Sequence, residues 1–294
     1  MPATRLCWRR PAACWHEGRD SVALKILSLN LWHDAGDWPA RAKLVREWLD
    51  RLDPDLIGFQ EALRVPRFDQ VEELLDGRGM HVDYVKASDF WKKGGEHEAG
   101  DVGNAVASRW PITSREACVL PSSPDGERRA ALSVTVDAPF GPVGFTVTHL
   151  NWRLHHGAVR EQQVQAVCEL ALRRAPEQGF PPILAGDFNA EPESAEIRYV
   201  TGHQSLNGSS VCFLDAWARE ADPVDRGFTW ANRNPNARGE LEPDRRIDYV
   251  FVGLPKRGGL GQILRGRVVC DEERSGVWPS DHFGVYAELR SELT

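Results

Sequence analysis

The residues of this 294-residue chain that could do chemistry are carboxylates, amides and histidines placed after short apolar runs. In "PPILAGDFNAEPES" (Pro181 to Ser194), Asp187 and Asn189 come directly after the apolar pair Ile183 and Leu184. Gly, Asp and Asn favour turns for local reasons, so a strand followed by an Asx-type turn would explain this stretch alone. A catalytic interpretation depends on what the other predicted strand ends carry.

The other predicted strand ends carry the same residue types. They are Asn30 in "LSLN", Gln60 and Glu61 in "GFQE", His149 and Asn151 in "THLN", Asp248 in "RRIDYVF", and Asp281 and His282 in "SDHFGV". Each alone has a structural explanation as a cap, a surface charge or a buried histidine. Together they suit catalysis, because oxygen ligands without cysteine favour Mg²⁺ or Mn²⁺, and histidines beside carboxylates suit proton transfer.

Short strands and amphipathic helices must position these residues. The hydrophobic pattern predicts strands at Ala23–Asn30, in "DPDLIGFQEA", around "VGNAVASRWP", "AALSVTVD" and "PVGFTVTHL", and in "RRIDYVFVG" and "DHFGVYAEL". Helices are predicted at Pro39–Leu52, Phe68–Leu75 and Val159–Arg174. Because strands and helices do not alternate strictly, the pattern disfavours a doubly wound parallel sheet and favours two packed sheets flanked by helices.

Two stretches without this periodicity, Ser88–Gly100 and Asn232–Arg246, are predicted to be long surface loops, which are often functional.

Composition limits the class of protein. The chain is 41% hydrophobic and 27% charged, as globular proteins are, and its net charge of −7 argues against a strongly basic nucleic-acid-binding surface. No apolar run is long enough to span a membrane, and residues 1–20 lack the apolar segment of a secretion signal. We therefore expect a disordered N-terminal extension at 1–20, a single domain at 21–294, and a cytoplasmic location.

The ordered series "LSLN", "GFQE", "GNAVASRWP", "THLN", "GDFNAEP", "RRIDYVF" and "SDHFGV" resembles the endonuclease/exonuclease/phosphatase superfamily of deoxyribonuclease-I-like phosphoesterases. The resemblance runs from about Leu24 to Leu289. It implies an α/β (α+β) fold, a four-layer α/β/β/α sandwich in which helices flank two packed mixed β-sheets. It also implies an active site at one edge of the sandwich that hydrolyses phosphoester bonds with a divalent metal, usually Mg²⁺, with Mn²⁺ as an alternative.

The resemblance also implies roles for individual residues. Glu61 is the principal metal ligand, and Asn30 and Asp281 support the metal. Among the residues with catalytic roles, Asp187 orients or deprotonates water, and Asn189 binds the phosphate or the nucleophile. His282 contacts the phosphate or acts as base, and Asp248 fixes His282. His149 acts as an acid or as a hydrogen-bond donor to the phosphate. Asn151 and Arg153 are expected to bind substrate. The base, Asp187 or His282, is left open.

Departures from the pattern bear on the substrate. Abasic-site endonucleases of this superfamily carry an Asp two residues after the first Asn, where this chain has Trp32. The start "LNLW" with "THLN" is more similar to the sphingomyelinase-like and deoxyribonuclease-like branches, which favours a phosphodiesterase.

The alternative is a phosphomonoesterase acting on inositol- or nucleotide-type phosphates. It would need a basic pocket, to which Lys92, Lys93, Arg153, His155, His156 and Arg160 could contribute. A catalytically inactive binding module would lack Glu61, Asp187 or His282, and all three are present. The sequence indicates a phosphoester substrate and no obligate protein partner.

Overall fold

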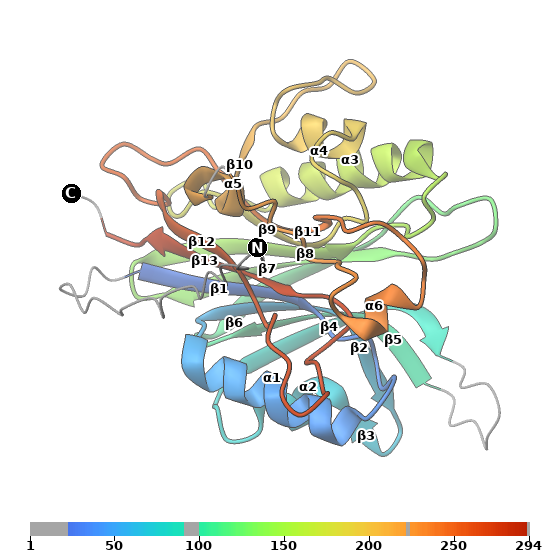
Figure 1. Cartoon of the computed structure of the whole chain (residues 1–294). Coiled ribbons are helices and arrows are strands. Elements are labelled where there is room, and N and C mark those ends of the chain that lie inside the picture. The colour runs from blue at the N-terminus through green and yellow to red at the C-terminus, as the bar shows by residue number, and fades with distance from the viewer. Residues whose placement is uncertain (1–22, 91–99, 222–223, 293–294) are drawn as a thin grey trace, which may run out of the picture.

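Two β-sheets pack face to face between layers of helices in the computed structural model, which describes residues 23–90, 100–221 and 224–292 (Figure 1). The extension predicted at residues 1–20 and most of the loop predicted at Ser88–Gly100 lie outside the described residues. The four-layer α/β/β/α sandwich expected from the sequence is confirmed.

The first sheet lies next to helices α1 (Trp38–Leu52) and α2 (Gln70–Leu75). Its strand order is β12 (Ile263–Val269), β13 (Gly284–Arg290), β1 (Ala23–Asn30), β2 (Leu56–Val65), β5 (Gly100–Ser108) and β4 (His81–Phe90), with β3 (Phe68–Asp69) paired to β2. Strands β1 and β2 are parallel, because α1 returns the chain to the end at which β1 began.

The second sheet is covered by α3 (Gly157–Arg173) and α4 (Ala195–Val200) on its outer face (Figure 1). Its strand order is β10 (Phe213–Asp215), β11 (Asp248–Gly253), β9 (Ile183–Asp187), β8 (Gly141–His149), β7 (Ala130–Ala138) and β6 (Ile112–Val119). Helix α3 connects the parallel pair β8 and β9. Two short helices, α5 (Ala216–Glu220) and α6 (Pro235–Arg238), lie in the connections between β10 and β11.

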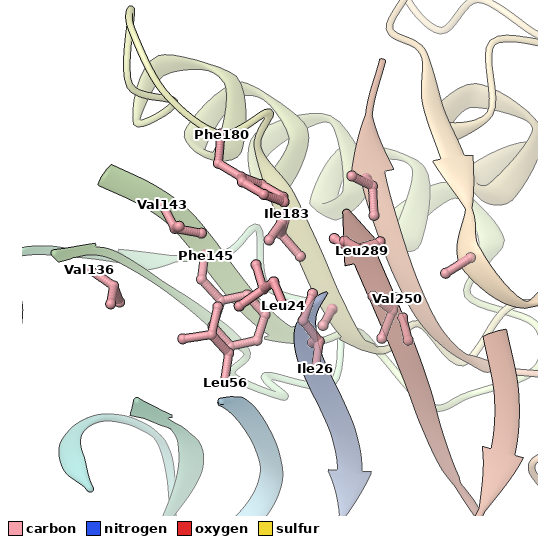
Figure 2. Packing of buried hydrophobic residues seen from close by; sticks show 14 of the residues in the cluster. Leu24, Ile26, Leu56, Val136, Val143, Phe145, Phe180, Ile183, Val250 and Leu289 are labelled. Atoms are coloured by element: carbon pink, nitrogen blue, oxygen red, sulfur yellow. The ribbon is translucent and has the colours of Figure 1, made fainter. Parts of the chain in front are cut away.

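The alternation of side chains along β1 explains the layers. Leu24 and Ile26 face the space between the sheets, where they pack with Phe145 and Ile183 of the second sheet (Figure 2). Leu27, the next residue along the strand, belongs to the cluster beneath α1 and α2. A strand that is apolar on both faces is thus buried on both faces.

The predicted strand at Ala23–Asn30 and the predicted helices near Pro39–Leu52 and Val159–Arg174 are confirmed within two residues at each end. The helix predicted at Phe68–Leu75 is wrong at its start, since Phe68–Asp69 forms β3 and the Asp69 side chain accepts from the first backbone N–H groups of α2.

The sequence pattern did not reveal β4, β6, β10 or β12. Strand β6 is an edge strand whose exposed face is polar, so it lacks an apolar signal. The predicted loop at Asn232–Arg246 holds one short helix, α6. Among the helices of the described residues, none is long and apolar enough to cross a membrane.

Gly186 is required where β9 meets β8. Its φ is +151°, and an added Cβ would lie 2.0 Å from the carbonyl oxygen of Thr148. We expect Gly186→Ala to lower the free energy of unfolding by roughly 3 kcal/mol or more, because a backbone atom must move. Gly77→Ala is the control, since its φ is +76° and no atom lies within 4 Å; it should cost only about 1–2 kcal/mol. Urea unfolding measures both, and equal losses would contradict the clash.

Candidate active site

Three of the predicted residues occupy one row across the second sheet. Antiparallel pairing places Asp248 of β11 beside Asp187 of β9, and parallel pairing places Asp187 beside His149 of β8. Paired positions on adjacent strands project from the same face, so two carboxylates and an imidazole converge. All three are buried.

The first sheet contributes Asn30, at the end of β1, and Glu61, which lies inside β2 because this strand continues to Val65 beyond its predicted end. Asn30 pairs with Gln60, and the register between β2 and β5 shifts between Phe59 and Ala62. Glu61 lies within this irregularity at a φ of +52°. Bulges of this kind redirect a side chain, and here the Glu61 carboxylate reaches the wall of a cleft.

Asn30 joins the two sheets. Its Nδ2 donates to Asp187 Oδ2 at 3.1 Å and to Glu61 Oε1 at 3.5 Å. The backbone N–H of Trp32 donates to Asn30 Oδ1 at 2.9 Å, which fixes the orientation of the amide. The nitrogen therefore faces the carboxylates, and Asn30 holds them at a set spacing.

His282 is held by Asp248. The imidazole Nδ1–H donates to Asp248 Oδ2 at 2.9 Å, and Nε2 lies 3.7 Å from Asp187 Oδ2. Burial alone would lower the pKa of His282, but the carboxylates of Asp248, Asp187 and Asp281 together raise this pKa well above its usual value. His282 is therefore an imidazolium in this environment.

His149, in contrast to His282, is uncharged. Burial, followed by the charges of Arg129 and His282, lowers the pKa of His149 well below its usual value. Arg129 Nη1 lies 2.9 Å from Nδ1, and Nε2 lies 3.1 Å from Asn189 Nδ2 and 3.3 Å from Asp187 Oδ2. His149 is thus a neutral imidazole held between Arg129 and Asn189.

Sequence reasoning missed Arg129 and its salt-bridge partner Glu127, 2.5 Å away. Both lie in "DGERRA", which has the composition of an ordinary charged turn. Only the contact of Arg129 with His149, and that of Glu127 with Arg129, reveal their place in the site.

The pKa of Asp187 is raised to about 7, because burial and the nearby Asp248 disfavour its charge. His282 and hydrogen bonds from the Asn189 backbone and Asn30 oppose this rise. The Asn189 N–H donates to Asp187 Oδ1 at 2.9 Å, which is the Asx turn expected from local propensity. The Asx turn therefore also holds the Asp187 carboxylate in the cluster of polar groups.

Asp281 lies near Glu61 at the other side of the cleft. Burial and the charge of Glu61 raise the pKa of Asp281 to about 6, while His282 lowers it. Neither Asp281 nor Glu61 forms a salt bridge within the described residues. Two neighbouring carboxylates that no salt bridge engages offer oxygen ligands of the kind that divalent cations prefer.

The cleft has a volume of about 470 Å³, within the usual range of ligand pockets. The predicted residues on its wall are Glu61, His149, Asp187, Asn189, Asp281 and His282. Asn30 and Asp248 lie behind them and contact Asp187 and His282.

Asn151 and Arg153 are not on this wall. Asn151 is fully buried, and its Nδ2 donates to Glu127. The Arg153 guanidinium pairs with Asp125. As substrate contacts they stay predictions, which this geometry does not favour.

The predicted basic pocket is not assembled within the described residues. Arg160 is buried and paired with Glu196, while Lys92 and Lys93 lie outside the described residues.

Residues 27–282 match the sequence model of the Endonuclease/Exonuclease/phosphatase family, and the chain belongs to this family. Protein angel of Drosophila melanogaster is 24% identical over 86% of this chain and 75% of that protein. Nocturnin of Xenopus laevis is 22% identical over 96% of this chain and 71% of that protein.

Solved structures have the same fold. The human Nocturnin catalytic domain with bound sulfate anion is 20% identical, with a TM-score of 0.67 over 92% of this chain and 94% of that one. D. rerio TDP2 complexed with single strand DNA product is also 20% identical, with a TM-score of 0.69 over 91% of this chain and 98% of that one.

The raised pKa of Asp187 makes stability depend on pH. Its pKa is about 7 in the folded protein against 3.8 ordinarily, so the unfolded chain releases its proton first and stability is lost as pH rises from 4 to 7. Asp187→Asn removes this loss. In EDTA, the free energy of unfolding of the variant minus that of wild type should rise by roughly 2–4 kcal/mol over this range. Urea titrations at several pH values measure it, and a difference independent of pH would refute the assignment.

Proposed function

We propose that this protein is a divalent-metal-dependent phosphodiesterase. The observation that carries the proposal is the convergence of polar groups from both sheets in one cleft. They are buried carboxylates, an amide and two histidines, one of which is cationic and the other neutral. Membership of a family of phosphoesterases supports hydrolysis of a phosphoester bond.

Glu61 and Asp281 would hold the metal. Their oxygen donors suit Mg²⁺, and also Mn²⁺, and their mutual repulsion would be relieved by a cation. The ligand atoms of Asp187, Asp248 and His282 also lie within 4.8 Å of one another. That group is less suitable, because its members are bonded to one another: Asp248 Oδ2 accepts from His282 Nδ1 at 2.9 Å. A bound divalent ion would polarise a phosphate oxygen and lower the pKa of a bound water.

Asp187 would accept the proton of the attacking water. A base is most effective when its pKa is near the working pH, and burial raises the pKa of Asp187 to about 7. Asn30 and the Asn189 backbone fix the carboxylate, so its position is set before substrate binds.

His282 would stabilise the phosphate. Its imidazolium carries a positive charge beside the place where negative charge develops, and Asp248 fixes its orientation. Neutral His149 and Asn189 lie on the same wall of the cleft and would contact the phosphate there. This division makes Asp187 the base and His282 the electrostatic group.

The charges of the cleft wall favour a diester over a monoester. Among the described residues, seven carboxylates and three arginines line it: Glu61, Asp89, Glu127, Asp187, Glu240, Glu242 and Asp281, with Arg128, Arg129 and Arg245. A phosphodiester carries one negative charge, whereas a monoester or an inositol polyphosphate carries more and would be repelled more strongly.

Hydrolysis of bis(p-nitrophenyl) phosphate tests the proposal. With Mg²⁺ we expect turnover that EDTA abolishes, and Asp187→Ala or His282→Gln should lower kcat by roughly 10²–10⁴-fold. His203→Gln is the control, because this exposed histidine lies outside the cleft. Full activity in EDTA, or in either cleft variant, would refute the proposed site. A comparison with p-nitrophenyl phosphate then separates diester from monoester preference.

A further inference from the structure

A large aromatic side chain lies exposed on the wall of the cleft. Trp152 retains 47% of its surface in contact with solvent, although an indole is normally buried for a substantial gain in free energy. It follows His149 by three residues, which span at most about 10 Å of extended chain. The Cα atoms of Trp152 and His149 are therefore no more than about 10 Å apart.

The loop that carries Trp152 is held from within the protein. The backbone N–H of Arg153 donates to Asn151 Oδ1 at 3.1 Å. The buried guanidinium of Arg160, paired with Glu196 at 2.8 Å, donates to the carbonyl oxygens of Asn151 at 3.2 Å and Arg153 at 2.6 Å. An exposed aromatic ring on a fixed backbone loses little conformational freedom when it binds a partner.

Arg153 also fixes the plane of the indole. Its guanidinium carbon lies 4.7 Å from the ring centroid of Trp152, and its Nε pairs with Asp125. This cation–π contact covers part of the ring, and the surface that stays exposed borders the cleft. A flat group bound in the cleft could stack there.

One cation on the same cleft wall is available for an anion. Arg128 is exposed there, and within residues 23–90, 100–221 and 224–292 it forms no salt bridge or hydrogen bond. The other two arginines that the described part of the wall carries are paired with Glu127 and Glu242. The described wall thus offers an aromatic surface and an unpaired guanidinium, which match a flat ring joined to one further phosphate.

We propose that Trp152 determines specificity by stacking on the base of a nucleotide esterified to the reacting phosphate, while Arg128 contacts a neighbouring phosphate. The inference rests on the proposed phosphodiesterase activity and names its substrate class as nucleotide-containing phosphodiesters. Lipid and inositol phosphodiesters lack the flat ring that this surface accommodates.

Two substrates with the same leaving group test this proposal: thymidine 5′-(p-nitrophenyl phosphate) and methyl p-nitrophenyl phosphate, both with Mg²⁺. Base stacking on an aromatic side chain corresponds to about 5- to 100-fold in affinity. We expect Trp152→Ala to lower kcat/KM for the thymidine substrate by this factor, mainly through KM, with less than about 2-fold change for the methyl substrate. Trp152→Phe should restore most of the loss.

Leu154→Ala is the matched control, because Leu154 is 56% exposed on the same loop but does not line the cleft. Equal effects of Trp152→Ala on both substrates, or no effect on either, would overturn the stacking role.

If wild type hydrolyses neither substrate, the phosphodiesterase proposal fails, and binding of thymidine 5′-monophosphate in EDTA decides the stacking role separately. Calorimetry should then give weaker binding for Trp152→Ala than for wild type, and equal binding or none would overturn it.

Discussion

The buried carboxylate of Asp187 is the charge around which the site is arranged. It lies where the two sheets meet, and hydrogen bonds from Asn30 of the first sheet and the Asn189 backbone of the second hold it. His149 and His282 approach the same Oδ2 at 3.3 and 3.7 Å. Since an isolated carboxylate is costly to bury, these groups must be present together, and their joint placement requires both sheets in register.

Two buried arginines hold the loops on either side of this charge. Arg41 of α1 donates to the carbonyl oxygens of Leu31, Trp32, His33 and Ala35 after β1, and to that of Pro279. Arg160 of α3 does the same for the loop after β8. In each strand–helix–strand unit, a guanidinium from the helix thus satisfies loop carbonyls that would otherwise be buried without donors. The cleft walls are consequently fixed by the same units that build the sheets.

The sequence predicted the elements and residues whose signal is local. Buried strands such as Ala23–Asn30 are marked by apolar residues, and polar residues at their ends indicate a site. Contacts between distant segments could not be predicted from it: Arg129 contacts His149 Nδ1, and Asn30 turns its nitrogen to the carboxylates. The polar edge strand β6 and the engagement of Asn151 with Glu127 likewise depend on tertiary pairing rather than on periodicity.

The proposed function depends on a divalent cation held by Glu61 and Asp281 in the cleft that Asp187 also lines. Anomalous scattering from a crystal grown with Mn²⁺ tests it most directly. We expect a peak in the cleft at bonding distance from oxygens of Glu61 and Asp281, with His282 still bonded to Asp248. The absence of a peak in the cleft, or a peak bonded to the His282 imidazole, would contradict this account.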